Sequence, residues 1–368
     1  MTVTIDDSTR RALGPYGFDE ALLASFVSKL AGPSSNAVTG ALAPPAAGDV
    51  TPLPKPGTPA REALAAKGLA AIRAGRVGAV VLAGGMATRF GGVVKAVVPV
   101  LGDKTFLELK HDDVARVALK ARREVPTFVM SSFTTHDRIR AHVDEKRLTS
   151  NGRPGIDVFP QYVSLRLTPE GALFKEADGS LSPYAPGHGD LTFALRRSGL
   201  LERFRAGGGR YLMMSNVDNL GATLDPALLG LHLELGARLT AEVVRKEKGD
   251  KGGAPARLDG RPQIVEGFRF PKDFDQDSIP VFNTNTFVLD AEAIDRDFEL
   301  PFYRVEKQVE GRTAVQFERL VGELTAFLPS TFVEVEREGA DGRFLPAKDP
   351  DELARRLPMI EELTRTRR

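Results

Sequence analysis

The sequence predicts an α/β fold with a doubly wound, mostly parallel sheet, preceded by a helical extension and followed by a short C-terminal helix. Two observations support this prediction. From Val77 onward, short apolar segments alternate with amphipathic segments of helical period, which is typical of parallel strands joined by helices. In addition, glycine-rich and polar stretches directly follow several of the apolar segments. Because ligands on such sheets bind at the carboxyl ends of strands, we look for function in these loops.

The individual elements follow from local patterns. Residues 19–31 predict an amphipathic helix capped by Asp19, and helical periodicity resumes at 61–74. Between them, residues 32–59 are rich in Pro, Gly and Ala, and we interpret them as a linker or an extended strap over the larger domain. Strands are predicted at 77–82, 127–131, 156–159, 210–215, 239–245, 262–266 and 281–288. Helices are predicted at 105–123, 189–206, 225–236 (capped by Asp225), 314–327 and 349–368.

Length and composition limit the possible functions. The 368 residues suffice for one large α/β domain with extensions, and we divide them into a helical N-terminal extension (1–76), a main domain (77–335) and a C-terminal segment (336–368). The net charge of +1 gives no overall attraction to nucleic acid or to a membrane surface. The absence of cysteine excludes disulfides and thiolate metal sites. Without a signal-like or membrane-spanning run, a cytoplasmic protein is expected.

A glycine-rich loop follows the first predicted strand, in the stretch VGAVVLAGGMATRFGG (77–92). Gly84 and Gly85 let backbone N–H groups approach a phosphate closely because no Cβ intervenes. Arg89 and Lys95 add positive charge to the same loop. The spacing is neither the dinucleotide fingerprint nor the P-loop. The alternative is an ordinary strand-to-helix turn with both cations on the surface.

A second polar stretch follows the strand predicted at 210–215. Asp218 lies there between Asn216 and Asn219. One carboxylate at a strand end suits a Mg²⁺ ion that takes its remaining ligands from substrate phosphates. The alternative is an Asx-turn, in which these side chains bond local backbone groups.

A histidine is presented by a third loop. His188 lies between Gly187 and Gly189, just before a helix that Asp190 is expected to cap. The bare backbone makes this a good place for a polar ligand, although a lone histidine in a loop is more often incidental. The other four histidines show no zinc spacing with it.

Two asparagines interrupt the apolar strand predicted at 281–288. Strand alternation puts Asn283 and Asn285 on one face. Buried amides need hydrogen-bond partners, and sugar hydroxyls are suitable ones; the alternative is a bulge or an edge strand. Lys348, in RFLPAKDPDEL (343–353), is by itself an ordinary surface lysine before a helix start.

Taken together, these stretches resemble one family, the eukaryotic-type UTP–glucose-1-phosphate uridylyltransferases, also called UDP-glucose pyrophosphorylases. The family's nucleotide loop, roughly L-x-G-G-x-G-T-x-x-G followed by a lysine, is similar to residues 82–91 and Lys95. Its P-P-G-H-G-D is similar to 185–190, its S-N-x-D-N-L-G-A-T is intact at 215–223, its F-N-T-N matches 282–285, its R-F-L-P-x-K matches 343–348, and its F-x-Q segment is similar to 159–161. The matches are in the family's order.

The resemblance implies a Rossmann-like, GT-A-like nucleotidyltransferase domain that forms UDP-glucose and pyrophosphate from UTP and glucose 1-phosphate, with Mg²⁺. Its implied nucleotide-binding residues are Leu82, Ala83, Gly84, Gly85, Gln161 and Gly189. Its implied sugar-binding residues are His188, Asn216, Asn283, Asn285 and, by a looser match, Glu266. Asp218 is the implied metal ligand, and Lys95, Arg89 and Lys348 are the implied catalytic cations.

The sequence departs from the family pattern in three places. Ala87 replaces the third glycine of the loop, and Val93 and Val94 precede Lys95 where the family has G-P. Arg89 is instead similar to the G-T-R loop of bacterial sugar nucleotidyltransferases. The family's C-terminal β-helix has no counterpart in this sequence, so a monomer, or a dimer through another surface, is expected. Two alternatives stay open: a UDP-N-acetylhexosamine pyrophosphorylase, and a catalytically inactive sugar-nucleotide-binding regulatory protein.

Overall fold

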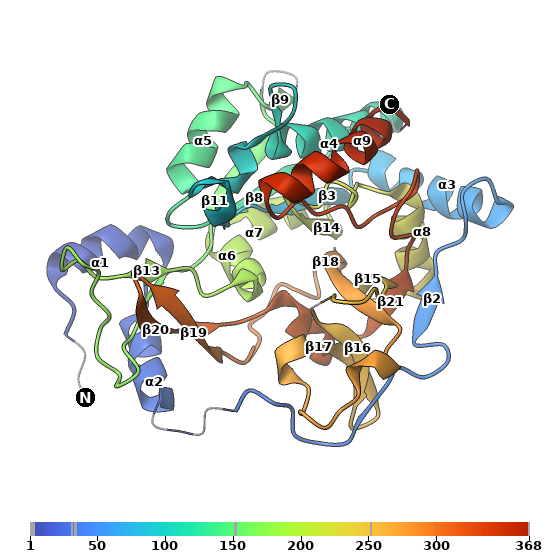
Figure 1. Cartoon of the computed structure of the whole chain (residues 1–368). Helices are drawn as coiled ribbons and strands as arrows, with labels where there is room; N and C mark the ends of the chain where they lie inside the picture. The colour runs from blue at the N-terminus through green and yellow to red at the C-terminus, as the bar shows by residue number, and fades with distance from the viewer. Residues whose placement is uncertain (1–3, 31, 33–34, 151–152, 251, 367–368) are drawn as a thin grey trace.

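The computed structural model describes residues 4–30, 32, 35–150, 153–250 and 252–366, and these residues build an eight-stranded central sheet (Figure 1). The strand order is β11-β8-β3-β14-β18-β15-β21-β2. In that order the strands are Ile156–Pro160, Thr127–Ser131, Val77–Leu82, Tyr211–Asn216, Val281–Asp290, Leu239–Arg245, Ser330–Glu334 and Val50–Pro52.

Seven of these eight strands run in the same direction, and β18 opposes its neighbours β14 and β15. Every residue of β3 is buried, as expected of a parallel strand covered on both faces. Strands β3, β8 and β15 have the predicted bounds, and β11, β14, β18 and the separate β17 (Arg261–Val265) differ by one or two residues. The predicted doubly wound, mostly parallel sheet is confirmed.

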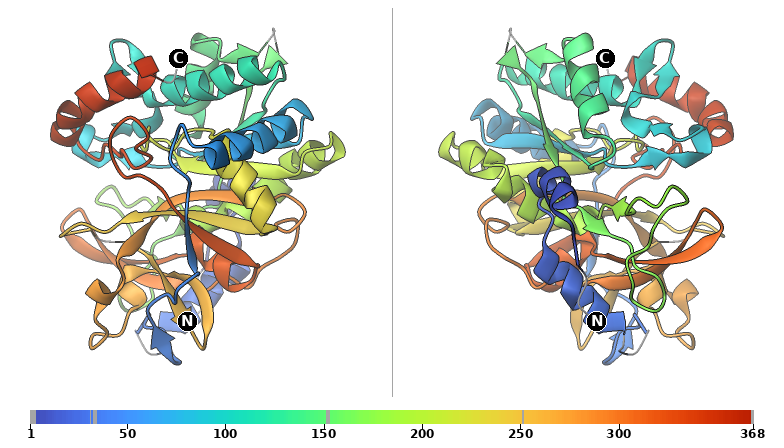
Figure 2. Two further views of the ribbon diagram at one scale, coloured as in Figure 1. Left: turned by 90° about the vertical axis from the view of Figure 1, so that its right-hand side faces the viewer. Right: turned by 90° about the vertical axis from the view of Figure 1, so that its left-hand side faces the viewer.

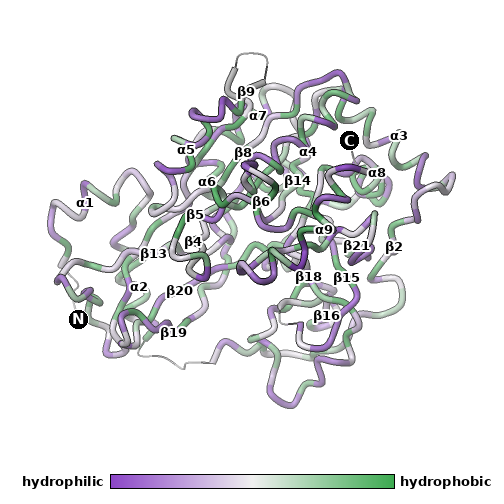
Figure 3. The backbone as a smooth tube through the Cα atoms, turned by 45° about the horizontal axis from the view of Figure 1, so that its top comes forward, coloured by the Kyte–Doolittle hydropathy of each residue, from purple (hydrophilic) through white to green (hydrophobic). Residues whose placement is uncertain are grey.

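Helices cover both faces of this sheet. The helices α3 (Pro59–Arg73), α4 (Phe106–Ala121) and α8 (Pro226–Leu235) share one hydrophobic cluster with one face of the strands. The helices α6 (Leu191–Arg197) and α7 (Leu200–Ala206) share a second cluster with the opposite face. Outer helices such as α5 alternate between hydrophilic and hydrophobic residues, as Figure 3 shows. This alternation is the amphipathic signature of a helix with one face in water.

Helices α3 and α8 lie side by side (Figure 2) and approach closely at two glycines. A Cβ on Gly68 would lie 1.8 Å from the carbonyl oxygen of Pro226, and a Cβ on Gly230 would lie 1.9 Å from that of Leu64. Any larger side chain at either position would push the helices apart. Asp225 caps α8 as predicted, because its carboxylate accepts hydrogen bonds from two backbone N–H groups of the first turn.

The N-terminal extension packs along the main domain. Asp19 caps α2 (Glu20–Leu30) as predicted, and Phe26 of this helix stacks on Phe317 with ring centroids 4.6 Å apart. The described part of the Pro- and Gly-rich segment consists of two short strands and loops, with turns at residues 47–48 and 56–57. Its strand β1 (Leu42–Ala43) pairs with β16, and β2 forms one edge of the central sheet beside β21.

Two predicted helices are wrong in part or in full. Residues 314–327 do not form an α-helix, because β20 (Arg312–Glu318) pairs along its whole length with β19 (Tyr303–Val309) and is followed by a 3₁₀ helix, η7 (Val321–Ala326). Strand pairing satisfies the backbone here and overrides the local helical spacing. The helix predicted at 189–206 is two helices, since Gly199 between them has φ 72°, a left-handed conformation that ends α6.

The C-terminal helix α9 (Pro350–Thr366) packs back on the main domain as predicted, with Ile360 and Leu363 buried. No helix within the described ranges has an apolar stretch of the length needed to traverse a bilayer. The remaining helices are α1 (Asp7–Leu13) and α5 (His136–Glu145). The remaining strands are β4 (Met86–Ala87), β5 (Val93–Val94), β6 (Pro99–Leu101), β7 (Lys104–Thr105), β9 (Thr149–Ser150), β10 (Arg153–Pro154), β12 (Ser164–Leu165), β13 (Pro183–Tyr184) and β16 (Ala254–Leu258).

Candidate active site

The candidate site lies along the carboxyl edge of the parallel strands. At this edge Asn216 of β14 pairs with Leu82 of β3, and Leu82 pairs with Met130 of β8. Because β18 is antiparallel, its first half begins at the same edge. The sheet therefore brings together loops that are far apart in the sequence, where ligands of such folds bind.

The glycine-rich loop after β3 folds into a small hairpin. Strand β4 (Met86–Ala87) pairs with β5 (Val93–Val94), and the backbone N–H of Lys95 donates to the Gly85 carbonyl at 3.4 Å. Ala83 at the strand end is buried, whereas Gly85 is exposed. The hairpin thus returns the chain to its starting point and places Lys95 beside the glycines.

Gln161 lies directly against Gly84. Its backbone N–H donates to the carbonyl of Ser131 at 2.9 Å, which fixes the chain just after β11. A Cβ on Gly84 would lie 2.5 Å from Nε2 of Gln161, so glycine leaves the room that this side chain occupies. Two residues predicted to bind the nucleotide therefore adjoin, although they follow different strands.

A buried ion pair holds the loop that carries Gly189. The carboxylate of Asp190 accepts from Nε of Arg319 at 2.6 Å and from the backbone N–H of Tyr162 at 3.0 Å. Asp190 therefore does not cap the following helix through its side chain, contrary to the prediction. The N–H of Gly189 donates to the Arg319 carbonyl at 2.9 Å. Because Tyr162 follows Gln161, the same ion pair holds Gln161 near Gly189.

Lys95 and Asp218 form an ion pair with an Nζ–Oδ2 distance of 2.5 Å. Both side chains are largely buried, with 14% and 17% of their surface exposed. Arg89 is more exposed and reaches Asp349, the residue after Lys348, at 3.9 Å. The two loops with predicted catalytic cations therefore converge with the predicted metal ligand.

Lys348 is exposed, on a segment fastened to the Asp218 loop. The N–H of Ala347 donates to the carbonyl of Asp218 at 3.3 Å. Oδ1 of Asn219 accepts from the backbone N–H of Leu345 at 2.8 Å, and its Nδ2 donates to the carbonyl of Arg343 at 3.2 Å. Asn219 is buried and joins the two segments through both ends of its side-chain amide.

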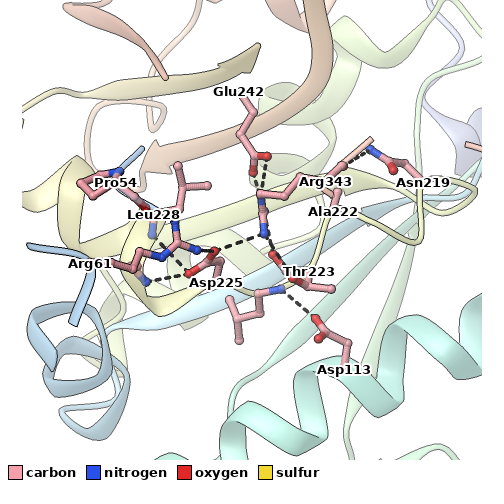
Figure 4. A network of polar contacts seen from close by, with 12 residues as sticks. Pro54, Arg61, Asp113, Asn219, Ala222, Thr223, Asp225, Leu228, Glu242 and Arg343 are labelled. Atoms are coloured by element: carbon pink, nitrogen blue, oxygen red, sulfur yellow. Dashed lines mark hydrogen bonds and ion pairs between the residues drawn. The ribbon is translucent and has the colours of Figure 1, made fainter. Parts of the chain in front are cut away.

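Arg343, a buried residue of the same segment, fastens it to the main domain (Figure 4). Both oxygens of Glu242 accept from Arg343 at 2.7 Å, and Nη1 of Arg343 donates to Thr223 at 3.2 Å and reaches Asp225 at 3.4 Å. Asp225 also accepts from Arg61 of α3 at 2.6 Å. Bidentate, charge-assisted bonds of this kind are strong and directional. The network therefore joins α3, α8, β15 and the Lys348 segment.

The three predicted asparagines meet at a bulge in β18. Nδ2 of Asn285 donates to Oδ1 of Asn216 at 2.9 Å, and the backbone N–H of Asn285 donates to Oδ1 of Asn283 at 3.0 Å. Asn285 has φ 58°, and the register with β15 shifts between Ala241 and Val243. The sequence was compatible with two interpretations of these asparagines, ligand contacts or a bulge, and the structure shows a bulge. Bulges re-aim side chains next to active sites, so the two readings are compatible.

His188 is held as an uncharged hydrogen-bond donor. Its Nδ1 accepts from the backbone N–H of Val321 at 3.1 Å. Burial lowers the pKa of His188 to about 4, so the ring is neutral at pH 7 and its single proton is on Nε2. Gly187 has φ 98°, and a Cβ there would lie 2.5 Å from the Arg319 carbonyl oxygen.

Glu266 follows β17 and lines a cavity of about 450 Å³ together with Phe282. A Cβ on Gly253 would lie 3.0 Å from its carboxylate, and the Gly253 carbonyl accepts from the N–H of Asn283 at 2.8 Å. Glu266 therefore lies next to the asparagine strand. Burial, together with the charge of Glu323, raises the pKa of Glu266 to about 7. A carboxyl in this state is able to donate as well as accept a hydrogen bond near neutral pH.

The acidic side chains do not form a closed metal site. Among the described residues, no group of three or more His, Asp and Glu side chains is placed to hold a metal ion. Asp218 offers one carboxylate, and Lys95 already bonds its Oδ2. This donor set fits Mg²⁺, which commonly takes one or two carboxylates and completes its shell with phosphates and water.

Comparison with known proteins identifies the family of this chain. Residues 49–358 match the family model described as UTP–glucose-1-phosphate uridylyltransferase. The chain belongs to this family. A uridylyltransferase from Encephalitozoon cuniculi is 28% identical over 288 residues, which cover 74% of this chain and 56% of that protein. One from Solanum tuberosum is 31% identical over 289 residues, covering 74% and 59%. The chain thus spans less than two thirds of the length of these uridylyltransferases.

Solved structures share the fold of this uridylyltransferase family member. A Trypanosoma brucei structure described as UDP-glucose phosphorylase has a TM-score of 0.74 at 25% identity and covers 94% of this chain and 76% of that one. The uridine diphosphate N-acetylglucosamine pyrophosphorylase of the same organism has a TM-score of 0.76 at 19% identity and covers 95% and 79%. The second similarity shows the fold alone.

Proposed function

We propose that this protein transfers a uridylyl group from UTP to glucose 1-phosphate and releases pyrophosphate. The observation that carries the proposal is the ion pair between Lys95 and Asp218, which joins the glycine loop to the loop after β14. The contact between Gln161 and Gly84 lies on the same edge of the sheet. Membership of the uridylyltransferase family supports the same reaction.

The protein's main task in this reaction is to hold and neutralise two polyanions. An oxygen of the sugar phosphate attacks the α-phosphorus of UTP, and pyrophosphate leaves in line. The attacking phosphate is already ionised, so no general base is required, and rate enhancement comes from alignment and charge stabilisation. We assign phosphate contacts to the backbone at Gly84 and Gly85, and charge neutralisation to Lys95, Arg89 and Lys348.

The remaining site residues would select the base and the sugar. Gln161 and the backbone of Gly189 would hydrogen-bond the uracil edge. His188 would donate through Nε2 without adding charge, since its other ring nitrogen already accepts a hydrogen bond. Glu266 would bond a sugar hydroxyl, and the amides of Asn216, Asn283 and Asn285 would do the same.

We also propose Mg²⁺ as a cofactor that Asp218 would hold. When bound, the ion would supply positive charge to phosphate oxygens during transfer. The hydrogen bond from Lys95 to Oδ2 keeps the ammonium beside the same carboxylate, so Lys95 is positioned for the same phosphates.

The deciding experiment is pyrophosphate release from UTP with a set of sugar 1-phosphates, with and without Mg²⁺. We expect the highest kcat/KM with glucose 1-phosphate. After a chelator removes Mg²⁺, we expect no pyrophosphate release. No release with any sugar, combined with UDP-glucose binding in calorimetry, would instead identify a sugar-nucleotide-binding protein.

A second candidate substrate is an N-acetylhexosamine 1-phosphate. The observation in its favour is the cavity of about 450 Å³ beside Glu266, which leaves room for a substituent larger than a hydroxyl. A higher kcat/KM with N-acetylglucosamine 1-phosphate than with glucose 1-phosphate in the same assay would support this candidate.

A further inference from the structure

Lys110 of α4 is a buried lysine that lies beneath the Asp218 loop. Only 5% of its surface is exposed. Its Nζ donates to Oγ of Ser215 at 3.0 Å and to the carbonyl oxygen of Ala222 at 2.7 Å. The bonded groups are thus a hydroxyl and a carbonyl at the base of a loop, and neither is a carboxylate.

The two acceptors bracket the loop that contains Asp218. Ser215 is the next-to-last residue of β14, and Ala222 precedes the cap of α8. One ammonium therefore bridges the two ends of the turn at 216–221. The turn is also fastened to the C-terminal segment, because Asn219 joins it to residues 343–345 and the N–H of Ala347 donates to the Asp218 carbonyl. The loop is thus held by the C-terminal segment and, through Lys110, by helix α4.

A buried ammonium is a costly way to join two neutral acceptors. Burial lowers the pKa of Lys110 to about 8, and the charge of Arg343 acts in the same direction. The charges of Asp113, Asp218 and Glu242 oppose this change and favour the ammonium. An apolar side chain would fill the same space without the desolvation penalty. The ammonium's own contribution is to fix both ends of the loop by directional hydrogen bonds.

We propose that Lys110 is a positioning residue for uridylyl transfer, which fixes the turn at 216–221 so that Asp218 stays in place beside Lys95. This inference rests on the proposed function. Lys110 touches neither substrate nor metal in this role. It acts through the loop, so its loss is expected to lower kcat more than it changes the KM for UTP.

The test replaces Lys110 and compares an exposed lysine of the same helix. Lys110→Met keeps the length and removes the donors, whereas Lys120→Met changes an exposed side chain of α4. We expect Lys110→Met to lower kcat at least tenfold with less than a threefold change in the KM for UTP, and Lys120→Met to match wild type. Wild-type kcat in a folded Lys110→Met protein would overturn the proposal.

A chemical rescue separates positioning from general stability. The chain contains no cysteine, so Lys110→Cys has a single thiol. Alkylation with 2-bromoethylamine in denaturant, followed by refolding, rebuilds an ammonium of nearly the same length. We expect the alkylated protein to recover most of the kcat lost in the unmodified cysteine variant, relative to wild type taken through the same cycle. No recovery after correct refolding would contradict the positioning role.

Hydrogen–deuterium exchange distinguishes this inference from the proposed function. If wild type transfers no uridylyl group to any sugar 1-phosphate, the proposed function fails, but amides at 216–221 are still expected to exchange faster in Lys110→Met. Should that variant fail to fold, Ser215→Ala removes one of the two acceptors and is expected to accelerate the same amides. Unchanged exchange in the folded variant would refute the role of Lys110 in holding the loop.

Discussion

Asp218 is a largely buried carboxylate that pairs with Lys95 at 2.5 Å, so its charge acts directly on that ammonium. Asp218→Asn keeps the side chain's size and removes the charge. We expect the fold to survive. Transition-state stabilisation should fall by several kcal/mol, so kcat at saturating Mg²⁺ should fall roughly 10²–10³-fold. Asp112→Asn, at an exposed carboxylate, is the control. Near-wild-type turnover of Asp218→Asn would contradict the metal assignment.

Lys95 of the main domain and Lys348 of the C-terminal segment both lie next to the Asp218 loop. We expect Lys95→Ala and Lys348→Ala each to lower kcat/KM by roughly 10²-fold, because each removes a positive charge from the phosphate region. Lys104→Ala should stay within about twofold of wild type, since Lys104 is exposed and pairs with Asp112. Steady-state kinetics of the three variants are compared at one ionic strength. An equal loss in Lys104→Ala would indicate a general electrostatic effect.

Glu266 makes the stability of the protein depend on pH. Its folded-state pKa is raised to about 7, so the folded protein binds the proton more tightly than the unfolded chain, and the stability linked to that proton is lost as pH rises toward 7. Glu266→Gln cannot ionise. We expect it to raise the free energy of unfolding at pH 8 by at most about 3 kcal/mol, and to have little effect below pH ~5.

Thermal melts of Glu266→Gln from pH 5 to 8 measure this difference. The exposed Glu202→Gln serves as the control and should follow wild type at each pH. A Glu266→Gln melting temperature that runs parallel to wild type across the range would show that the carboxyl is ionised throughout.

At the scale of elements, the bonds between Arg343 and Glu242 connect the C-terminal segment to strand β15. Glu242 is fully buried. Removing one partner of such a pair leaves an uncompensated buried charge, so we expect Arg343→Met to lower the free energy of unfolding by about 3–5 kcal/mol. Urea denaturation measures this change. The exposed Arg210→Met should change it by less than about 0.5 kcal/mol.

A second substitution tests the cause of that loss. Combining Arg343→Met with Glu242→Gln removes the stranded charge, so the double variant should be more stable than Arg343→Met alone. A double variant as unstable as the sum of its single variants would show that packing, and not the buried charge, causes the loss.

The sequence was sufficient to predict the strands that local pattern controls. The continuous apolar run at 77–82 needs burial on both faces and forms β3 with the predicted bounds. Residues 314–327 were mispredicted although their partner is close in the sequence: β19 and β20 form a hairpin joined by a two-residue turn at Glu310 and Gly311, both with positive φ, and this turn signal was not recognised. Strands β2 and β21 show the limit of local pattern, because they are short and are stabilised by neighbours distant in the sequence.

The loops of the site were also predictable, since ligand-binding loops follow strands in this fold class. The residues that fasten the loops were not. Arg343 and Lys110 are charged, and charged residues are usually on the surface; their burial depends on acceptors about a hundred positions away in the chain. The ion pair between Asp190 and Arg319 is missed for the same reason. The charged residues can be seen in the sequence, but which of them pair in the fold cannot be predicted from it.

On the scale of the whole molecule, the strand order explains why one site collects residues from most of the chain. Gln161 follows the edge strand β11, whereas Asn285 lies in β18, beyond three intervening strands. The segment from Arg343 to Lys348 then crosses back over the loop after β14 and leads into α9. The final helix therefore contributes to holding the site as well as covering the domain.

The buried face of α9 bears on assembly. Ile360 and Leu363 lie in a cluster with Phe106 of α4, at 1% and 7% exposure, so they are not free to contact another subunit. We expect Ile360→Ala with Leu363→Ala to lower the free energy of unfolding by about 2–5 kcal/mol per site, and to leave the mass in light scattering that of the wild-type monomer or dimer. Glu361→Ala, on the exposed face of α9, is the control. A stable wild-type octamer would contradict the expected assembly. A dimer that the double alanine variant dissociates without loss of stability would show that α9 is itself a subunit interface.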